Sequence, residues 1–337
     1  MIRNVLSALV LFALAACTAA PTPEPTLPAA TAAEATAAPG TAALRTIRLP
    51  MGFLPSVQYA PFYVAQEKGY FAAEGLALEF DYSFETDGVA LVGAGELPFA
   101  IVSAEQVLLA RAQSLPVVYV MAWFQKFPVA VMAKADAGLD TPAALRGKRI
   151  GTPLLGGANF VGLHALLTAG GVPAEDVTIE AIGFNQVPLL TAGQVDAVVV
   201  YANNEPIRLA AQGEAFSVIP VSDYAELAAN GILSSEATIA EEPELVRSFV
   251  RAFLRGLADT DANPNEAYDI TTQYVEGLTD PALEKEVLAA TMALWQAERP
   301  GYSDPAAWEN MQATLLESGL LEEAQDVTQA YTNEFVP

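Results

Sequence analysis

The sequence predicts an α/β protein built from two similar lobes. Residues 90–103 align without gaps on residues 188–201, and each copy reads as a helix end, an Ala-Gly turn and an apolar strand. Helical segments that alternate with short β-branched runs are typical of parallel strands covered on both faces. The segment 45–337 is long enough for one large domain or two lobes.

The predicted elements follow one another in this alternating order. A strand over 45–52 precedes a helix over 61–74 and a strand over 76–82. Further strands are predicted over 117–123, 129–133, 149–151 and 177–182, and helices over 159–169 and 187–192. The last third is mostly helical. Within 243–257 a core-forming apolar face recurs every four residues: Leu245, Phe249, Phe253 and Leu257.

The N-terminal residues indicate an export signal. The single cysteine, Cys17, follows Leu14-Ala15-Ala16, behind Arg3 and an apolar run too short to cross a bilayer. This arrangement resembles the lipobox of diacylated bacterial lipoproteins, which implies that residues 1–16 are removed and that Cys17 carries acyl chains such as palmitate. A secretory peptide cut nearby is the alternative.

The segment that follows Cys17 predicts a disordered tether over 17–44. It consists almost entirely of Ala, Thr, Pro, Gly and Glu, which cannot bury enough apolar surface to offset the entropy of ordering. No later run is apolar enough to span a membrane, so we expect the folded part to lie outside the membrane and to be held there by its lipid.

Charge narrows the range of partners. Sixteen Lys and Arg against forty Asp and Glu give a formal net charge of −24, which repels nucleic acid and anionic lipid surfaces. We read this charge as a solvated exterior. With its only cysteine lipidated, the chain has no thiol for a disulfide, for catalysis or for a metal site.

Three stretches resemble one family of receptors. They are GFLPSVQYAPFYVAQEKGYFAAEGL at 52–76, LRGKRIG at 145–151 and GQVD at 193–196. They are similar to bacterial solute-binding proteins related to receptors for thiamine pyrimidine precursors and, more distantly, to nitrate, sulfonate and taurine receptors. The resemblance implies a type 2 periplasmic-binding-protein fold over 45–337, with one lobe of about 45–130 plus 223–337 and another of about 131–222. It also implies a monomer that delivers a small molecule to an ABC permease and its ATPase.

The ligand cleft is expected at the carboxyl ends of the strands, where open α/β sheets bind ligands. The candidate residues there are Phe53, Gln58, Tyr59, Phe62, Ser103, Trp123, Asn159, Phe160, Asn185, Tyr201, Asn204 and Glu205. Glu105 and Phe184 also follow strands but are not among the candidates. Aromatic and amide side chains with few cations favour a planar heteroaromatic ligand over an oxyanion.

Two motifs bear on the identity of the ligand. Pyrimidine receptors of the family place an acidic-aromatic pair, an Asn and a His where this chain has residues 52–59. QYAPFY at 58–63 and YANNEP at 201–206 look more like a branch associated with riboflavin uptake. That resemblance implies riboflavin as a transported ligand and no resident cofactor, with Asn204 or Glu205 near the ribityl hydroxyls. A thiamine precursor receptor, a sulfonate receptor and a lipoprotein that senses without transport remain alternatives.

The remaining class of function to consider is an enzyme. Eukaryotic pyrimidine synthases share this fold and use a lysine-bound pyridoxal phosphate and a histidine. Here the only histidine, His164, falls inside the helical pattern over 160–169, as a packing residue would, and no lysine is among the strand-end candidates. No metal-ligand cluster and no Ser-His-Asp set can be assembled, so we predict no catalytic residues.

Overall fold

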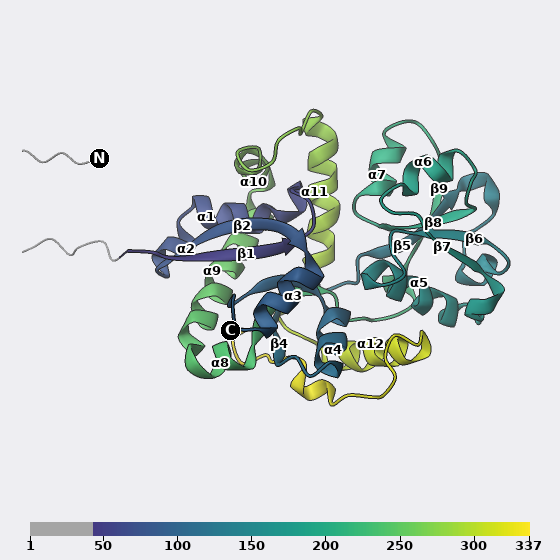
Figure 1. Cartoon of the computed structure of the whole chain (residues 1–337). Helices are drawn as coiled ribbons and strands as arrows, with labels where there is room; N and C mark the ends of the chain where they lie inside the picture. The colour runs from purple at the N-terminus through teal and green to yellow at the C-terminus, as the bar shows by residue number, and fades with distance from the viewer. Residues whose placement is uncertain (1–42) are drawn as a thin grey trace, which may run out of the picture. The chain divides into compact units, whose positions relative to one another are not determined.

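The computed structural model describes residues 43–337, whose strands form three sheets (Figure 1). The predicted signal peptide, Cys17 and most of the predicted tether lie outside the described residues. The strands are β1 Arg45–Gly52, β2 Leu76–Phe84, β3 Ala100–Ser103, β4 Val117–Ala122, β5 Val129–Lys134, β6 Arg149–Thr152, β7 Thr178–Ala181, β8 Ala197–Tyr201, β9 Phe216–Pro220 and β10 Asn230–Ser235.

Two of the sheets make up the first lobe. β1 pairs with β2 in parallel, and β10 lies between β3 and β4, antiparallel to both. β1 also lies beside β3, so the strands follow the order β2-β1-β3-β10-β4. Helices of this part are α1 Ala60–Glu67, α2 Tyr70–Ala73, α3 Glu85–Gly93 and α4 Ala104–Ala112.

The third sheet belongs to the second lobe and has the order β7-β6-β8-β5-β9. β6 is parallel to β7 and β8, whereas β5 is antiparallel to β8 and β9. The helices of this lobe are α5 Gly157–Ala169, α6 Gln186–Thr191 and α7 Glu205–Ala210.

The expectation of parallel sheets is therefore only partly right. β5 and β10 run against their neighbours, and each follows a segment that crosses from one lobe to the other, 123–128 and 221–229. A strand that enters its sheet from the crossing starts at the edge where the parallel strands end, so its direction is reversed.

The C-terminal part is helical, as predicted, with α8 Glu236–Glu241, α9 Pro243–Ala262, α10 Pro264–Thr271, α11 Pro281–Trp295 and α12 Pro305–Glu317. The four apolar residues of α9 that recur every four positions are all buried in the core. Proline opens four of these helices, and the Asp280 and Asp304 carboxylates accept hydrogen bonds from the first backbone amides of α11 and α12.

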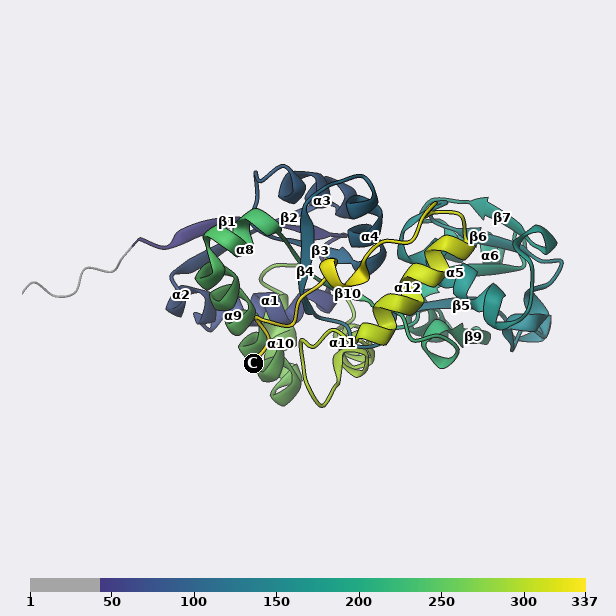
Figure 2. The ribbon, with the colours of Figure 1, turned by 90° about the horizontal axis from the view of Figure 1, so that it is seen from below.

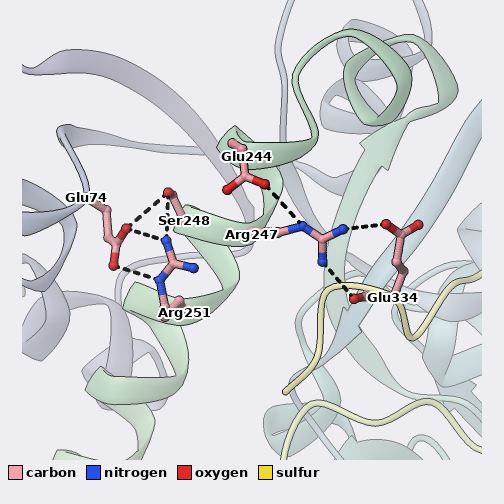
Figure 3. Close-up of polar contacts among 6 residues, drawn as sticks. All are labelled: Glu74, Glu244, Arg247, Ser248, Arg251 and Glu334. Atoms are coloured by element: carbon pink, nitrogen blue, oxygen red, sulfur yellow. Dashed lines mark hydrogen bonds and ion pairs between the residues drawn. The ribbon is translucent and has the colours of Figure 1, made fainter.

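α9 also collects polar contacts from distant segments (Figure 3). Arg251 donates from Nε and Nη2 to the Glu74 carboxylate at 2.9 and 2.6 Å, joining α9 to the end of α2. Arg247 donates to Glu334 in the C-terminal segment. These contacts fix the helical layer against the first lobe.

α12 reaches the second lobe, where it lies alongside α5 (Figure 2). The Thr168 hydroxyl donates to the Glu317 carboxylate at 2.9 Å across this contact. No helix in the described part of the chain is both long and apolar enough to span a bilayer.

Candidate functional site

An aromatic cluster lies at the end of β1. Tyr59, in the short helix Val57–Tyr59, donates from its hydroxyl to the carbonyl of Met51 at 2.7 Å, and its ring centroid is 5.6 Å from that of Trp123. The Trp123 indole stacks on Phe124 with centroids 4.7 Å apart. Phe62 is buried beneath this cluster, and its ring centroid is 4.4 Å from that of Phe253. Phe62 therefore packs between the core and the rings of Tyr59 and Trp123.

Two exposed aromatic rings meet where the lobes face each other. Phe53 follows β1 of the first lobe and Phe184 follows β7 of the second, and their centroids are 5.9 Å apart at an interplanar angle of 56°. Phe53 is 38% exposed and Phe184 59% exposed, so both rings are accessible from the space between the lobes. Phe53 is one of the predicted site residues, whereas Phe184 was not among the candidates.

A pair of carboxyls lies beside this aromatic cluster. Glu85 opens α3, and Ser103 ends β3 just before Glu105. Glu85 Oε2 accepts hydrogen bonds from the Ser103 amide at 3.1 Å and from the Ser103 hydroxyl at 2.5 Å. The same hydroxyl also contacts Glu105 Oε1. Burial raises the pKa of both carboxyls, and for Glu85 the charge of Glu105 adds to the effect.

Tyr201 brings the second lobe to the carboxyl pair. Burial raises the pKa of its hydroxyl, and the next contributions come from the nearby Glu85 and Glu105 carboxyls. The Tyr201 amide donates to Glu205 Oε2 at 3.1 Å, and burial raises the pKa of Glu205 as well. Tyr201 and Glu205 therefore lie at the same edge as the carboxyls of the first lobe.

Three buried polar atoms at this edge have no hydrogen-bond partner within the described chain. They are Nε1 of Trp123, Oδ1 of Asn230 and Oε2 of Glu105, and the three residues are 2%, 7% and 0% exposed. Asn230 is paired with Ser103 across the β3-β10 ladder, so the two side chains share one face of the sheet. Buried polar groups in folded proteins are mostly hydrogen-bonded, which makes these atoms candidates for contact with a ligand.

The turn after β8 connects the lobes through α11. The side-chain oxygen Oδ1 of Asn204 accepts from Arg208 Nε at 2.7 Å, and Arg208 also binds Glu284 of α11. The Asn203 amide donates to the Thr291 hydroxyl at 2.8 Å. Asn204 thus orients an interlobe ion pair.

The remaining candidates make local contacts. Asn159 and Phe160 are half-buried in the first turn of α5, and the Phe160 ring lies 4.5 Å from His164. Exposed Asn185 donates to the carbonyl of Ile182 at 3.1 Å. The nearly buried Gln58 donates from its backbone amide to Ser56 Oγ.

Sequence reasoning missed Glu85 and Asn230. β2 extends to Phe84, two residues beyond the predicted strand, so Glu85 directly follows a parallel strand. Asn230 begins an antiparallel strand, so a search restricted to carboxyl ends passes over it. A strand that follows a segment crossing between the lobes runs in the reverse direction, so its first residue lies at the site. This rule would have identified Asn230.

A separate groove of about 490 Å³ lies at the crossing segments. It is lined by residues of 125–127, 222–227 and 297–307, and none of the candidate residues is part of it. Within residues 43–337, no group of three His, Cys, Asp or Glu side chains is placed to hold a metal ion.

Comparison with known proteins identifies the family. A family model described as NMT1/THI5 like matches residues 56–267. The riboflavin-binding protein RibY of Chloroflexus aurantiacus is 44% identical over 98% of this chain and 97% of its own. The formylaminopyrimidine-binding protein of Halalkalibacterium halodurans is 29% identical over 80% of this chain and 84% of its own.

The fold also matches solved structures. The alkanesulfonate-binding protein SsuA from Xanthomonas axonopodis pv. citri superposes with a TM-score of 0.67 at 18% identity, over 87% of this chain and 100% of that one. This likeness confirms the predicted periplasmic-binding-protein fold. With two α/β lobes and a family match over most of its folded part, this chain belongs to the NMT1/THI5-like family.

Proposed function

We propose that this protein is the substrate-binding component of an ABC importer and that its ligand is riboflavin. The observation that supports this most is the 44% identity to a riboflavin-binding protein over nearly the full length of both chains. The site supports it independently, because the aromatic faces, the unpaired Trp123 indole nitrogen and the unpaired Asn230 amide oxygen suit a flat ring with polar edges.

The receptor works by capture and closure. The ligand enters between the lobes and lies against the aromatic cluster of Tyr59 and Trp123, while Tyr201 reaches it from the second lobe. Contacts made to both lobes favour the closed state, so the ligand shifts the equilibrium towards it. The closed receptor docks on a membrane permease whose partner ATPase supplies the energy, and the receptor itself carries out no reaction.

Two competing functions fit the site less well. A sulfonate would place an anion beside the carboxyl pair of Glu85 and Glu105, and the negative charge held by that pair disfavours an anion. A pyridoxal enzyme needs a lysine and a histidine at the site. His164 instead packs on Phe160 within α5, and burial lowers its pKa.

Export and lipid anchoring through Cys17 are part of the proposal. An extracytoplasmic receptor that is monomeric and tethered by 17–44 stays close to its permease. Cys17→Ser is expected to abolish incorporation of labelled palmitate and to release the protein from the membrane fraction. Palmitate labelling that persists in Cys17→Ser would contradict this assignment.

The ligand is tested by titrating the mature chain, purified in mild detergent, with riboflavin while flavin and Trp fluorescence are followed. We expect saturable quenching with micromolar or tighter affinity. Formylaminopyrimidine and taurine are titrated in parallel. Tight binding of the pyrimidine with no response to riboflavin would overturn the assignment and place the chain with the thiamine-precursor receptors.

A further inference from the structure

The carboxyls of Glu85 and Glu105 meet at a single hydroxyl. Ser103 Oγ lies 2.5 Å from Glu85 Oε2 and also contacts Glu105 Oε1. A serine hydroxyl has one hydrogen and donates only once. The second contact therefore needs a hydrogen from a carboxyl, and the three side chains hold one shared proton between the two acids.

The geometry places this proton on Glu105. Glu105 is 0% exposed, and its Oε2 has no hydrogen-bond partner among the described residues. Glu85 is only half-buried, and its Oε2 accepts both the amide and the hydroxyl of Ser103. Glu105 Oε1 also lies 3.3 Å from the Gln106 side-chain amide, a longer contact than either hydrogen bond to Glu85 Oε2. Donors favour the charged form of a carboxyl and burial favours the neutral form, so the shorter bonds and greater exposure of Glu85 favour the charge there. Glu105 therefore donates to Ser103, and Ser103 donates to a charged Glu85.

No cationic side chain of the described residues neutralises the charge of Glu85. The carboxyl pair acts electrostatically on three tyrosine hydroxyls, those of Tyr59 from the helix after β1, Tyr119 from β4 and Tyr201 from β8. Burial raises the pKa of all three, so they stay neutral at physiological pH. No Lys, Arg or His contributes to the pKa of either carboxyl within residues 43–337.

The backbone makes room for Glu85. Gly52 has a φ of +81°, and a Cβ on it would lie 2.7 Å from Glu85 Cγ. The end of β1 is thus shaped to seat this side chain at the edge of the sheet. Trp123 Nε1, a donor, and the Asn230 amide, whose Oδ1 is unpaired, lie at the same edge.

We propose that Glu85 is a specificity-determining residue whose free carboxylate oxygen accepts a hydrogen bond from an N–H of a neutral heterocycle, and that Ser103 and Glu105 position it. This inference rests on the proposed function and specifies how the ligand is read. The acceptor, beside the Trp123 donor, complements a ring edge in which an N–H adjoins a carbonyl. A flavin ring carries such an edge at N3.

The test compares riboflavin with N3-methylriboflavin, which lacks the N–H, on the full mature chain. Hydrogen bonds to charged groups contribute about 1.5–3 kcal/mol, so wild type is expected to bind the methylated flavin about tenfold or more weakly. In Glu85→Gln the amide oxygen must face the Ser103 donors, which turns the NH₂ group towards the ligand N–H. The preference for riboflavin over the methylated flavin should then disappear.

Glu105→Gln is the conservative variant of this positioning residue, because an amide donates to Ser103 as the protonated acid does. It should keep the preference for riboflavin over the methylated flavin at pH 7. Wild type should lose affinity between pH 7 and 9, as the shared proton leaves and a second carboxylate forms, and Glu105→Gln should not. A pH profile reports on the proton, which a purely structural role of Glu105 would not affect.

The outcomes separate this inference from the proposed function. Tight riboflavin binding by wild type, with equal affinity for the methylated flavin, overturns the role of Glu85 and leaves the receptor assignment intact. An alkaline loss of affinity that is the same in Glu105→Gln overturns the shared proton. No binding of either flavin would contradict the receptor assignment itself. If Glu85→Gln does not fold, two measurements still test the proposal: the affinity of wild type for the methylated flavin and the pH profile of Glu105→Gln.

Discussion

The guanidinium of Arg208 donates two hydrogen bonds, of 2.8 and 2.9 Å, to the carboxylate of Glu284. Arg208 belongs to α7 of the second lobe and Glu284 to α11 of the first. The Glu284 side chain is 7% exposed and the Arg208 side chain 35%, so the carboxylate end of the pair is shielded from solvent and the guanidinium end is partly hydrated. Because the two residues come from different lobes, the ion pair holds the lobes in the arrangement seen here and is lost when they separate.

Breaking this ion pair is expected to destabilise the closed receptor. Glu284→Gln should accelerate riboflavin dissociation about three- to tenfold, because removing one charge of a partly buried pair acts mainly on the dissociation rate and the remaining Arg208 is partly hydrated. Stopped-flow fluorescence measures this rate. Glu236→Gln is the control, since its pair with Arg111 lies on the surface of the first lobe with Glu236 53% exposed. Equal dissociation rates in Glu284→Gln and wild type would show that the pair does not hold the lobes closed.

The unpaired Trp123 indole nitrogen predicts a contact with the ligand. Trp123→Phe keeps an aromatic ring but removes the N–H, and we expect riboflavin affinity to fall about fivefold or more. Trp308→Phe is the matched control, because Trp308 is equally buried but packs on Tyr331 away from the cluster. Trp308→Phe should lower thermal stability and leave the Kd unchanged. A similar loss of affinity in both variants would mean that packing, not the N–H, is responsible.

The raised pKa values of Glu85 and Glu105 predict how the stability of the ligand-free protein depends on pH. The folded state holds a proton that the unfolded chain releases near pH 4.5, so this pair costs stability progressively as pH rises above that value towards the raised pKa. Glu105→Gln lowers this cost, because it removes one of the two carboxyls and the charge that adds to burial in raising the pKa of Glu85. Its Tm should exceed that of wild type by about 2 °C or more at pH 8.5, and the advantage should shrink at pH 5. A Tm difference that does not change with pH would contradict the assignment.

The sequence predicted the elements of the fold better than their directions. The strand over 45–52 was predicted at its observed bounds, because its apolar pattern is regular. The helix predicted over 61–74 is interrupted at Gly69, which adopts a φ of +70° between α1 and α2. A glycine inside a helical pattern gives no sign, from sequence alone, of whether it breaks the helix.

The site was predictable only where residues follow parallel strands. Tyr59, Trp123 and Tyr201 were found in this way, and the structure brings them to one edge. The partners that complete the edge depend on topology. Asn230 arrives on a reversed strand, and Glu85 lies at a strand end that the pattern placed two residues too early. The shared proton follows from three-dimensional contacts, so no periodicity reveals it.

Gly52 provides the most direct test of how the site is built. Gly52→Ala forces a positive φ on an alanine and a Cβ against Glu85, so it should destabilise the fold by about 1 kcal/mol or more and also displace Glu85. Gly95→Ala is the matched control, since Gly95 has a φ of +74° but open space around its Cβ position. Both variants carry the backbone strain, and only Gly52→Ala meets the carboxylate. Denaturant unfolding should show a loss of stability in both variants, whereas riboflavin affinity should fall about tenfold in Gly52→Ala alone. If Gly95→Ala weakened riboflavin binding equally, global destabilisation would explain the loss and Gly52 would have no specific role in seating Glu85.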